Sequence, residues 1–133
     1  SLYFSAHIRF FGRTQPTLKC QNEKDKFTVN TNNGNGSLTY PVGLLTADEM
    51  VYAGGNPNVS NKSFYLYNKS DQWLLSPINS TTSGLFGYTL SSVGSLDGYS
   101  ISGAYGVRPV ISLKSGTAIS KGSGTATDPF IVE

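Results

Sequence analysis

The sequence predicts a single α+β domain in which short antiparallel strands accompany one or two short helices. Apolar and polar residues alternate in short runs, and turn residues interrupt these runs about every eight to twelve positions. One segment also carries a complete helix-start signal. Because a chain of 133 residues suits one hydrophobic core, we expect residues 1–133 to form one domain.

The N-terminal third gives weak local signals. Aromatic residues lie at helical spacing in residues 1–13, but an early glycine stops the pattern, so the structure of this segment stays ambiguous. Two later segments, residues 15–20 and 26–29, have the pattern of short extended pieces. Residues 30–37 consist of Asn, Gly, Thr and Ser, which tolerate a left-handed backbone, and are therefore predicted to form a surface loop.

A short helix is predicted at residues 47–53. Thr46 stands before it and Glu49 follows three positions later, so the two side chains can form a capping box. Leu45 and Met50 occupy the positions of a hydrophobic staple. A pair of glycines after residue 53 supplies the left-handed stop, so the sequence defines both ends of this helix.

Beyond the helix, the pattern predicts strands joined by polar turns. We expect strands at residues 64–67, 72–77, 107–113 and 130–132. Pro77 should end the second of them, because proline cannot donate to a sheet ladder. Residues 84–102 alternate with period two, with turns expected at Gly94–Ser95 and at residues 103–106.

The composition excludes several classes of protein. Charged residues make up 14% of the chain, against about 25% in an average protein. The net charge of +2 is not the footprint of a nucleic-acid binder. Aromatic residues reach 12%, which argues against disorder. No apolar run approaches the roughly 20 residues that a membrane span needs, so we expect no membrane contact by this segment.

Three single residues need separate interpretation. Cys20 is the only cysteine, which excludes an internal disulfide and a cysteine-based zinc site; we expect it to be buried, with pairing to a segment outside this chain as the alternative. His7 is the only histidine and is expected to have a surface or packing role. Arg108 lies in an apolar strand, so it should pair with backbone carbonyls or with a carboxylate such as Asp48 or Asp128.

Four sequence blocks carry a recognisable combination of motifs. They are TQPTLKC (14–20), LTYPVGLLTADEMVYAGG (38–55), WLLSP (73–77) with YGVRPVISL (105–113), and GSGTATDPFIVE (122–133). Together they resemble an uncharacterised domain family of secreted and surface-anchored proteins from gut Firmicutes and related bacteria. In that family YPVGLITADE, YWTMSP and GVRPVINL recur, and the domain often ends in GTGTxxDPY. The resemblance implies a location outside the cell or at the bacterial surface, and a chain trimmed at its N-terminus.

That family is distantly similar to the C-type-lectin-like fold, in the variant shared with formylglycine-generating enzymes. The analogy rests on the W-x-x-S-P strand, here residues 73–77, and on the later G-V-R-P-V strand, here residues 106–110. The enzymes with that fold need a pair of catalytic cysteines, whereas this chain has only Cys20. The resemblance therefore implies the fold without that activity.

The family resemblance also implies a diversified binding face at residues 78–105, where small polar and aromatic residues vary between the two conserved strands. The segment is rich in Tyr, Ser and Gly, which dominate antibody-like binding surfaces. The candidate ligand-binding residues are Trp73, Tyr88, Ser91, Ser95, Asp97, Tyr99, Ser102 and Tyr105. In the alternative interpretation they are ordinary solvent-facing strand and turn residues, and Trp73 belongs to the core.

The first functional hypothesis is a non-enzymatic, adhesin-like or lectin-like domain that binds a glycan or a protein ligand without a cofactor or metal. A structural domain of a surface appendage, similar to a pilin, suits the same composition. A glycan-cleaving enzyme ranks below both, because nothing in the sequence brings its candidate acid pair, Asp71 and Asp97, together. The loop at residues 56–61 contains no carboxylate, so it is not expected to bind calcium tightly.

Overall fold

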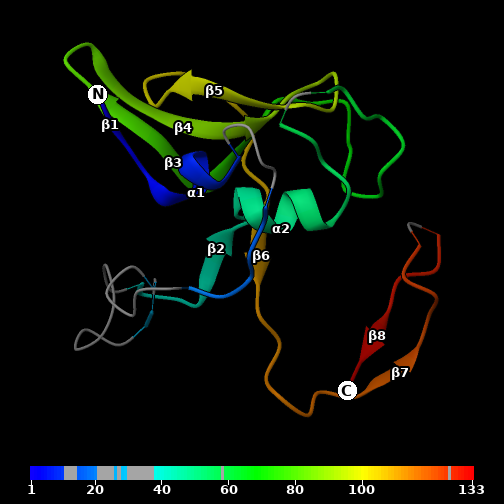
Figure 1. The fold of residues 1–133 in the computed structure, drawn as a ribbon. Helices are drawn as coiled ribbons and strands as arrows, with labels where there is room; N and C mark the ends of the chain where they lie inside the picture. Colours follow the sequence, from blue (N-terminus) through cyan, green and yellow to red (C-terminus); the bar gives the residue numbers. More distant parts are fainter. Residues whose placement is uncertain (11–14, 21–25, 27, 30–37, 58, 126) are drawn as a thin grey trace.

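A computed structural model describes the chain except for residues 11–14, 21–25, 27, 30–37, 58 and 126 (Figure 1). The predicted loop at residues 30–37 lies outside the described residues, and so does part of the predicted strand at residues 26–29. Within that strand, the Thr28 carbonyl accepts a hydrogen bond of 2.8 Å from the Leu38 amide. No helix among the described residues is both long and apolar enough to cross a membrane.

A four-stranded antiparallel sheet, in the order β1-β3-β4-β5, forms the centre of the fold (Figure 1). Its strands are β1 (Leu2–Tyr3), β3 (Gln72–Thr81), β4 (Gly84–Leu90) and β5 (Leu96–Ser100). Two small antiparallel pairs join β2 (Val42–Leu44) to β6 (Pro109–Ile111) and β7 (Ile119–Lys121) to β8 (Ile131–Val132). The helices are α1 (Ser5–Phe10) and α2 (Ala47–Tyr52). This arrangement agrees with the predicted small α+β class.

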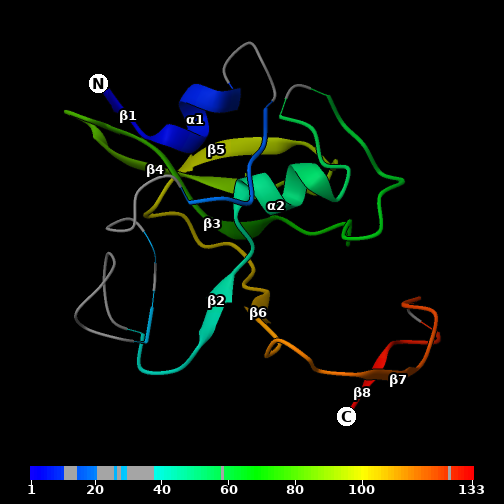
Figure 2. The same ribbon diagram turned by 60° about the horizontal axis from the view of Figure 1, so that its bottom comes forward.

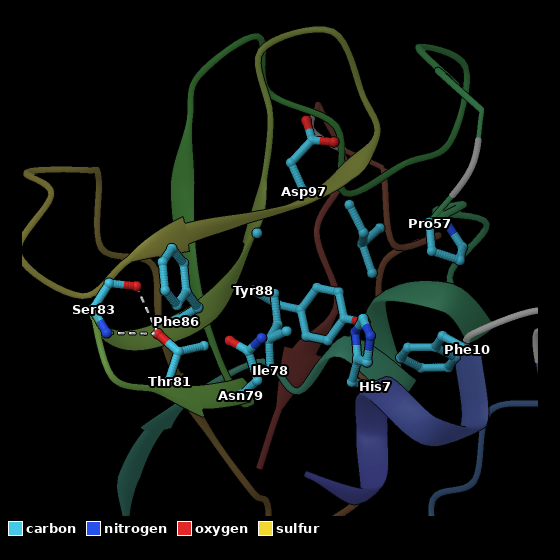
Figure 3. A pocket seen from close by; sticks show the side chains of 12 residues that line it. His7, Phe10, Pro57, Ile78, Asn79, Thr81, Ser83, Phe86, Tyr88 and Asp97 are labelled. Atoms are coloured by element: carbon cyan, nitrogen blue, oxygen red, sulfur yellow. Dashed lines mark hydrogen bonds between the residues drawn. The ribbon is translucent and has the colours of Figure 1, made fainter. Parts of the chain in front are cut away.

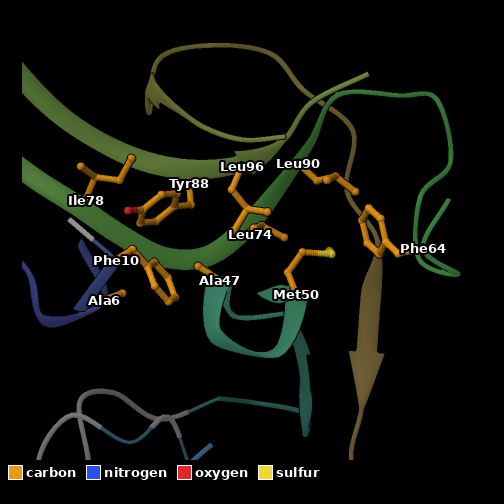
Figure 4. Packing of buried hydrophobic residues seen from close by; sticks show 10 residues of the cluster. All are labelled: Ala6, Phe10, Ala47, Met50, Phe64, Leu74, Ile78, Tyr88, Leu90 and Leu96. Carbon is orange, nitrogen blue, oxygen red and sulfur yellow. The ribbon is translucent and has the colours of Figure 1, made fainter. Parts of the chain in front are cut away.

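Both helices pack on one face of the four-stranded sheet, which we call the inner face (Figure 4). The buried cluster there consists of Ala6, Phe10, Ala47, Met50, Phe64, Leu74, Ile78, Tyr88, Leu90 and Leu96. Leu90 lies opposite both Gln72 and Leu96, and all three are buried. Because side chains alternate along a strand, the next pair, Trp73 opposite Thr89, points to the other face, which we call the outer face.

The predicted helix is confirmed as α2, together with its cap. The Glu49 amide donates to Thr46 Oγ1 at 3.1 Å, and the Thr46 amide donates back to Glu49 Oε2 at 2.8 Å. Residues 1–13, which the sequence left ambiguous, contribute both the short strand β1 and the helix α1. The turn expected at Gly94 is also confirmed, with a φ of 85° that favours glycine.

Two predictions about strands are wrong. Residues 64–67 form a turn, closed by a hydrogen bond of 3.1 Å from the Tyr67 amide to the Phe64 carbonyl. Phe64 is buried in the cluster and Tyr67 packs against it, so the apolar residues of this segment anchor a turn to the core instead of pairing in a sheet. Pro77 does not end β3 but lies inside it. The pairing with β4 shifts register on both sides of Pro77, and such a bulge accommodates a residue that has no amide hydrogen.

The C-terminal half is less regular than expected. The strand predicted at residues 107–113 is shorter, because only β6 pairs with β2 there, whereas β8 matches the strand predicted at residues 130–132. The hairpin of β7 and β8 lies apart from the four-stranded sheet in both ribbon views (Figures 1 and 2). Cys20 is exposed, which corrects the expectation that it is buried: it lies at the end of a segment, residues 15–20, that forms neither helix nor strand.

Candidate ligand-binding surface

The sheet divides the predicted binding residues between its two faces. Tyr88 points to the inner face and is 5% exposed, whereas Tyr99 lies opposite Gly87 on the outer face and is 40% exposed. Trp73 also lies on the outer face and is half-buried. Residues 78–105 therefore do not form one continuous exposed face, because alternation along β4 and β5 separates their side chains.

Tyr88 is a packing residue of the inner face. Its hydroxyl lies 3.1 Å from His7 Nδ1, and its ring meets the edge of Phe10 with centroids 5.9 Å apart. Burial, together with the nearby charge of Asp48, raises the pKa of Tyr88 to about 12, while the nearby Arg9 opposes both effects. The neutral phenol is therefore the stable form at physiological pH.

The pKa of Tyr88 predicts a late step in an alkaline titration. Because the phenol ionises near pH 10 in the unfolded chain and near pH 12 in the folded one, stability should fall as the pH rises through that window. Ultraviolet absorbance of the phenolate should contain a component near pH 12 that the Tyr88→Phe variant lacks. The component that the Tyr88→Phe variant lacks belongs to the Tyr88 phenolate. If this component appeared near pH 10 while the chain is still folded, Tyr88 would not be the buried packing residue described here.

Ser91, Ser95 and Asp97 form the hydrogen-bond network of the turn between β4 and β5. The Ser91 amide donates to the Ser95 carbonyl at 2.9 Å, and the two hydroxyl oxygens are also 2.9 Å apart. The Ser95 hydroxyl donates to Asp97 Oδ2 at 2.9 Å. Gly94 in this turn accepts a hydrogen bond of 3.1 Å from the Asn61 amide. These three polar side chains therefore stabilise the turn.

Three of the predicted residues do come together, on the outer face. Trp73 and Tyr105 meet edge to face with centroids 5.1 Å apart, and the rings of Tyr105 and Tyr99 are 5.0 Å apart. We call Trp73, Tyr99 and Tyr105 the outer aromatic cluster. Partial burial raises the pKa of Tyr105, and the neighbouring Tyr99 and Asp71 raise it further. All three rings thus present hydrocarbon surface and polar edges within one short span of the sheet.

Backbone pairing positions this cluster. The Trp73 amide donates to the Gly106 carbonyl at 2.9 Å, and the Gly106 amide donates to the Asp71 carbonyl at 3.0 Å. This bridge holds Tyr105 beside the start of β3, next to Trp73. Gly87 lies beneath the indole, since a Cβ there would be 3.3 Å from Trp73 Cζ3. The glycine therefore allows the indole to lie directly on β4.

The surface beside the cluster is apolar and hollowed. Leu85 is 46% exposed and Ile101 is 58% exposed, and both lie near the indole of Trp73. Together with Pro77 they line a hollow of about 240 Å³. Ser102 is exposed next to Ile101, and its hydroxyl lies 2.8 Å from that of Ser100. Ser100 lies opposite Phe86, so its side chain belongs to the inner face, and a ligand on the outer face would meet rings, aliphatic groups and the hydroxyls of the two tyrosines.

The charged residues singled out in the sequence have structural partners. Arg108 donates to the Leu66 carbonyl at 2.7 Å, which confirms the expected carbonyl pairing. Its two suggested carboxylate partners lie elsewhere: Asp48 pairs with Arg9, and Asp128 accepts from the Ser123 amide at 2.9 Å.

The carboxylates of the suggested acid pair each stabilise a turn. Asp71 accepts from the Ser92 amide at 2.6 Å, and Asp97 accepts from Ser95 as described above. Within the described part of the chain, no three His, Cys, Asp or Glu side chains lie close enough together to hold a metal ion.

The fold and this surface define a small α+β domain with an aromatic cluster on the outer face of its sheet. Comparisons with protein-family profiles, with curated proteins and with solved structures find no match to the chain. The functional argument therefore rests on the residues of the chain itself.

Proposed function

We propose that this chain is a non-enzymatic, lectin-like domain that binds a carbohydrate through the outer aromatic cluster, outside the cell or at a bacterial surface. The observation that carries the proposal is the contact of Trp73, Tyr105 and Tyr99 on the outer face of the sheet, opposite the face on which α1 and α2 pack. The C-type-lectin-like fold is part of the same proposal, and the mixed antiparallel architecture is compatible with it.

The chemistry of the cluster suits a sugar. The C–H-rich face of a pyranose packs well against aromatic rings, and tyrosine keeps a hydroxyl available for hydrogen bonding. Tyr99 and Tyr105 supply such hydroxyls beside the half-buried indole of Trp73. Such rings lose little conformational entropy on binding, because each has only two rotatable side-chain bonds.

Replacing Tyr99 with Ala should weaken glycan binding about tenfold or more, because it removes an exposed ring from the cluster. We would screen the full chain on a glycan array and then measure the affinity of the best glycan by calorimetry. The matched control is Tyr65→Ala, since Tyr65 is 80% exposed on the turn at residues 64–67 and outside the cluster.

The control variant should bind like the unaltered chain. The proposal fails if the array detects no glycan, or if Tyr99→Ala and Tyr65→Ala bind equally well. Binding to a protein array alone, with loss in Tyr99→Ala, would assign the cluster to a protein ligand and overturn the carbohydrate proposal.

A structural domain of a surface appendage is the second candidate, and the β7–β8 hairpin favours it. Ile119, Phe130 and Ile131 are all more than half exposed there. A two-stranded hairpin is only marginally stable without further packing. A neighbouring module that covers this hairpin would explain its apolar surface. Light scattering should then show concentration-dependent assembly that Phe130→Ser abolishes; a monomer at all concentrations would exclude assembly through this hairpin.

A further inference from the structure

A second hollow lies on the inner face, distinct from the outer aromatic cluster. It has a volume of about 650 Å³ and opens between α1 and the strands β3, β4 and β5 (Figure 3). Its walls include His7 and Phe10 from α1, Asn79 from β3, and Phe86 and Tyr88 from β4. This volume lies in the range of about 300–1,000 Å³ that is typical of small-molecule sites.

The walls of this pocket are mostly aromatic, and they are held in place. The His7 ring is fixed between two tyrosines: it stacks on Tyr3 with centroids 4.8 Å apart, and its Nδ1 lies 3.1 Å from the Tyr88 hydroxyl. Phe10 also contacts Tyr88, edge to face. A preformed aromatic wall favours a flat ring over a flexible chain, because little ordering accompanies binding.

One polar atom of the pocket has no hydrogen-bond partner. Asn79 Oδ1 is buried, and the described residues offer it no donor. The side chain lines the pocket and lies beside Ile78 and Tyr88 (Figure 3). A buried acceptor without a donor is destabilising, and this oxygen is closed to solvent, so a ligand gains affinity from it when the Asn79 side chain turns toward the pocket and accepts a hydrogen bond there.

The charges near the pocket exclude an acidic ligand. Asp97 is the only carboxylate among the lining residues, and its side chain points away from Tyr88 and His7 (Figure 3). The Tyr88 phenol stays neutral well above physiological pH. Among the residues that the structure describes, no lysine or arginine lines the pocket to pair with an anion.

We infer that this inner-face pocket binds a small, neutral aromatic molecule that carries one hydrogen-bond donor, with its rings against Phe86 and Tyr88 and its donor on Asn79 Oδ1. The pocket contains none of Trp73, Tyr99 and Tyr105, so it is distinct from the outer aromatic cluster, although Asn79 and Phe86 also line the hollow beside that cluster.

Two probes test this inference on the full chain: 2-naphthol, which carries a hydroxyl donor, and naphthalene, which has the same rings without it. We would measure both affinities by probe fluorescence and map the contacts by amide chemical shifts. We expect 2-naphthol to bind several-fold to tenfold more tightly than naphthalene, with shifts at Phe86, Tyr88 and Gly98. In the Asn79→Leu variant the two probes should bind equally, because the acceptor is gone.

A second variant keeps the inference testable if Asn79→Leu does not fold. Ser83 lines the pocket and is exposed, so a larger side chain there should obstruct the entrance without disturbing the fold. We therefore expect Ser83→Tyr to lower the affinity for both probes to the same extent. The inference is overturned if neither probe changes the amide chemical shifts of the pocket residues, or if the largest changes occur at Trp73 and Tyr99. It is also overturned if a folded Asn79→Leu variant still prefers 2-naphthol.

Discussion

Replacing Arg9 with Met should lower the free energy of unfolding by about 3 kcal/mol, because it leaves the carboxylate of Asp48 buried without its cation. Asp48 is 4% exposed, and Arg9 holds it with two hydrogen bonds, Nε to Oδ1 at 3.0 Å and Nη2 to Oδ2 at 2.6 Å. The Thr17 amide adds a third, at 2.8 Å. This one carboxylate thus joins α1, the first turn of α2 and the segment around residue 17.

Urea unfolding near neutral pH measures this loss, and a double variant identifies its cause. Arg9→Met combined with Asp48→Asn removes both charges, so it should recover part of the stability that Arg9→Met loses. A loss below about 1 kcal/mol in the single variant would show that the pair behaves like an exposed ion pair. A double variant less stable than the single one would show that the unpaired charge is not the cause.

Replacing Leu90 with Ala should cost about 3 kcal/mol, the range seen when a fully buried leucine leaves a cavity. Leu90 is 0% exposed and lies between Gln72 and Leu96 in the register of the sheet. Met50 of α2 belongs to the same cluster and is also fully buried (Figure 4). The substitution therefore removes packing between the sheet and the helix that covers it.

The same strand supplies a matched control. Leu85 is also a leucine of β4, but it points to the outer face and is 46% exposed. Leu85→Ala should cost less than about 1 kcal/mol in the same urea experiment. Equal losses in the two variants would contradict the assignment of inner and outer faces.

The parts of the fold that could be predicted from sequence are those set by neighbouring residues. The capping box needs only Thr46 and Glu49, and the turn at Gly94 needs a residue with a left-handed backbone. The strand predictions fail where pairing between segments that are distant in the sequence overrides the local pattern. A bulge against β4 lets β3 continue through Pro77, and the sequence carries no local sign of the partner strand.

The candidate site shows the same limit. The sequence indicates Trp73 and Tyr105 as candidate ligand-binding residues, but their contact depends on the pairing of Gly106 with the start of β3. The Tyr88–His7 contact spans 81 positions in the sequence, and the Arg9–Asp48 pair spans 39. Composition draws attention to the aromatic and small polar residues of residues 78–105. It could not separate the two faces of the sheet, because that depends on the register of β4 with β5.

The fluorescence of Trp73 tests the proposed carbohydrate surface most directly, because Trp73 is the only tryptophan in the chain and belongs to the outer aromatic cluster. The full chain would be titrated with the glycan selected on the array while its emission is followed. We predict a saturable change in intensity or wavelength with the same midpoint as the calorimetric titration. Calorimetric binding with unchanged emission from Trp73 would contradict the proposed surface.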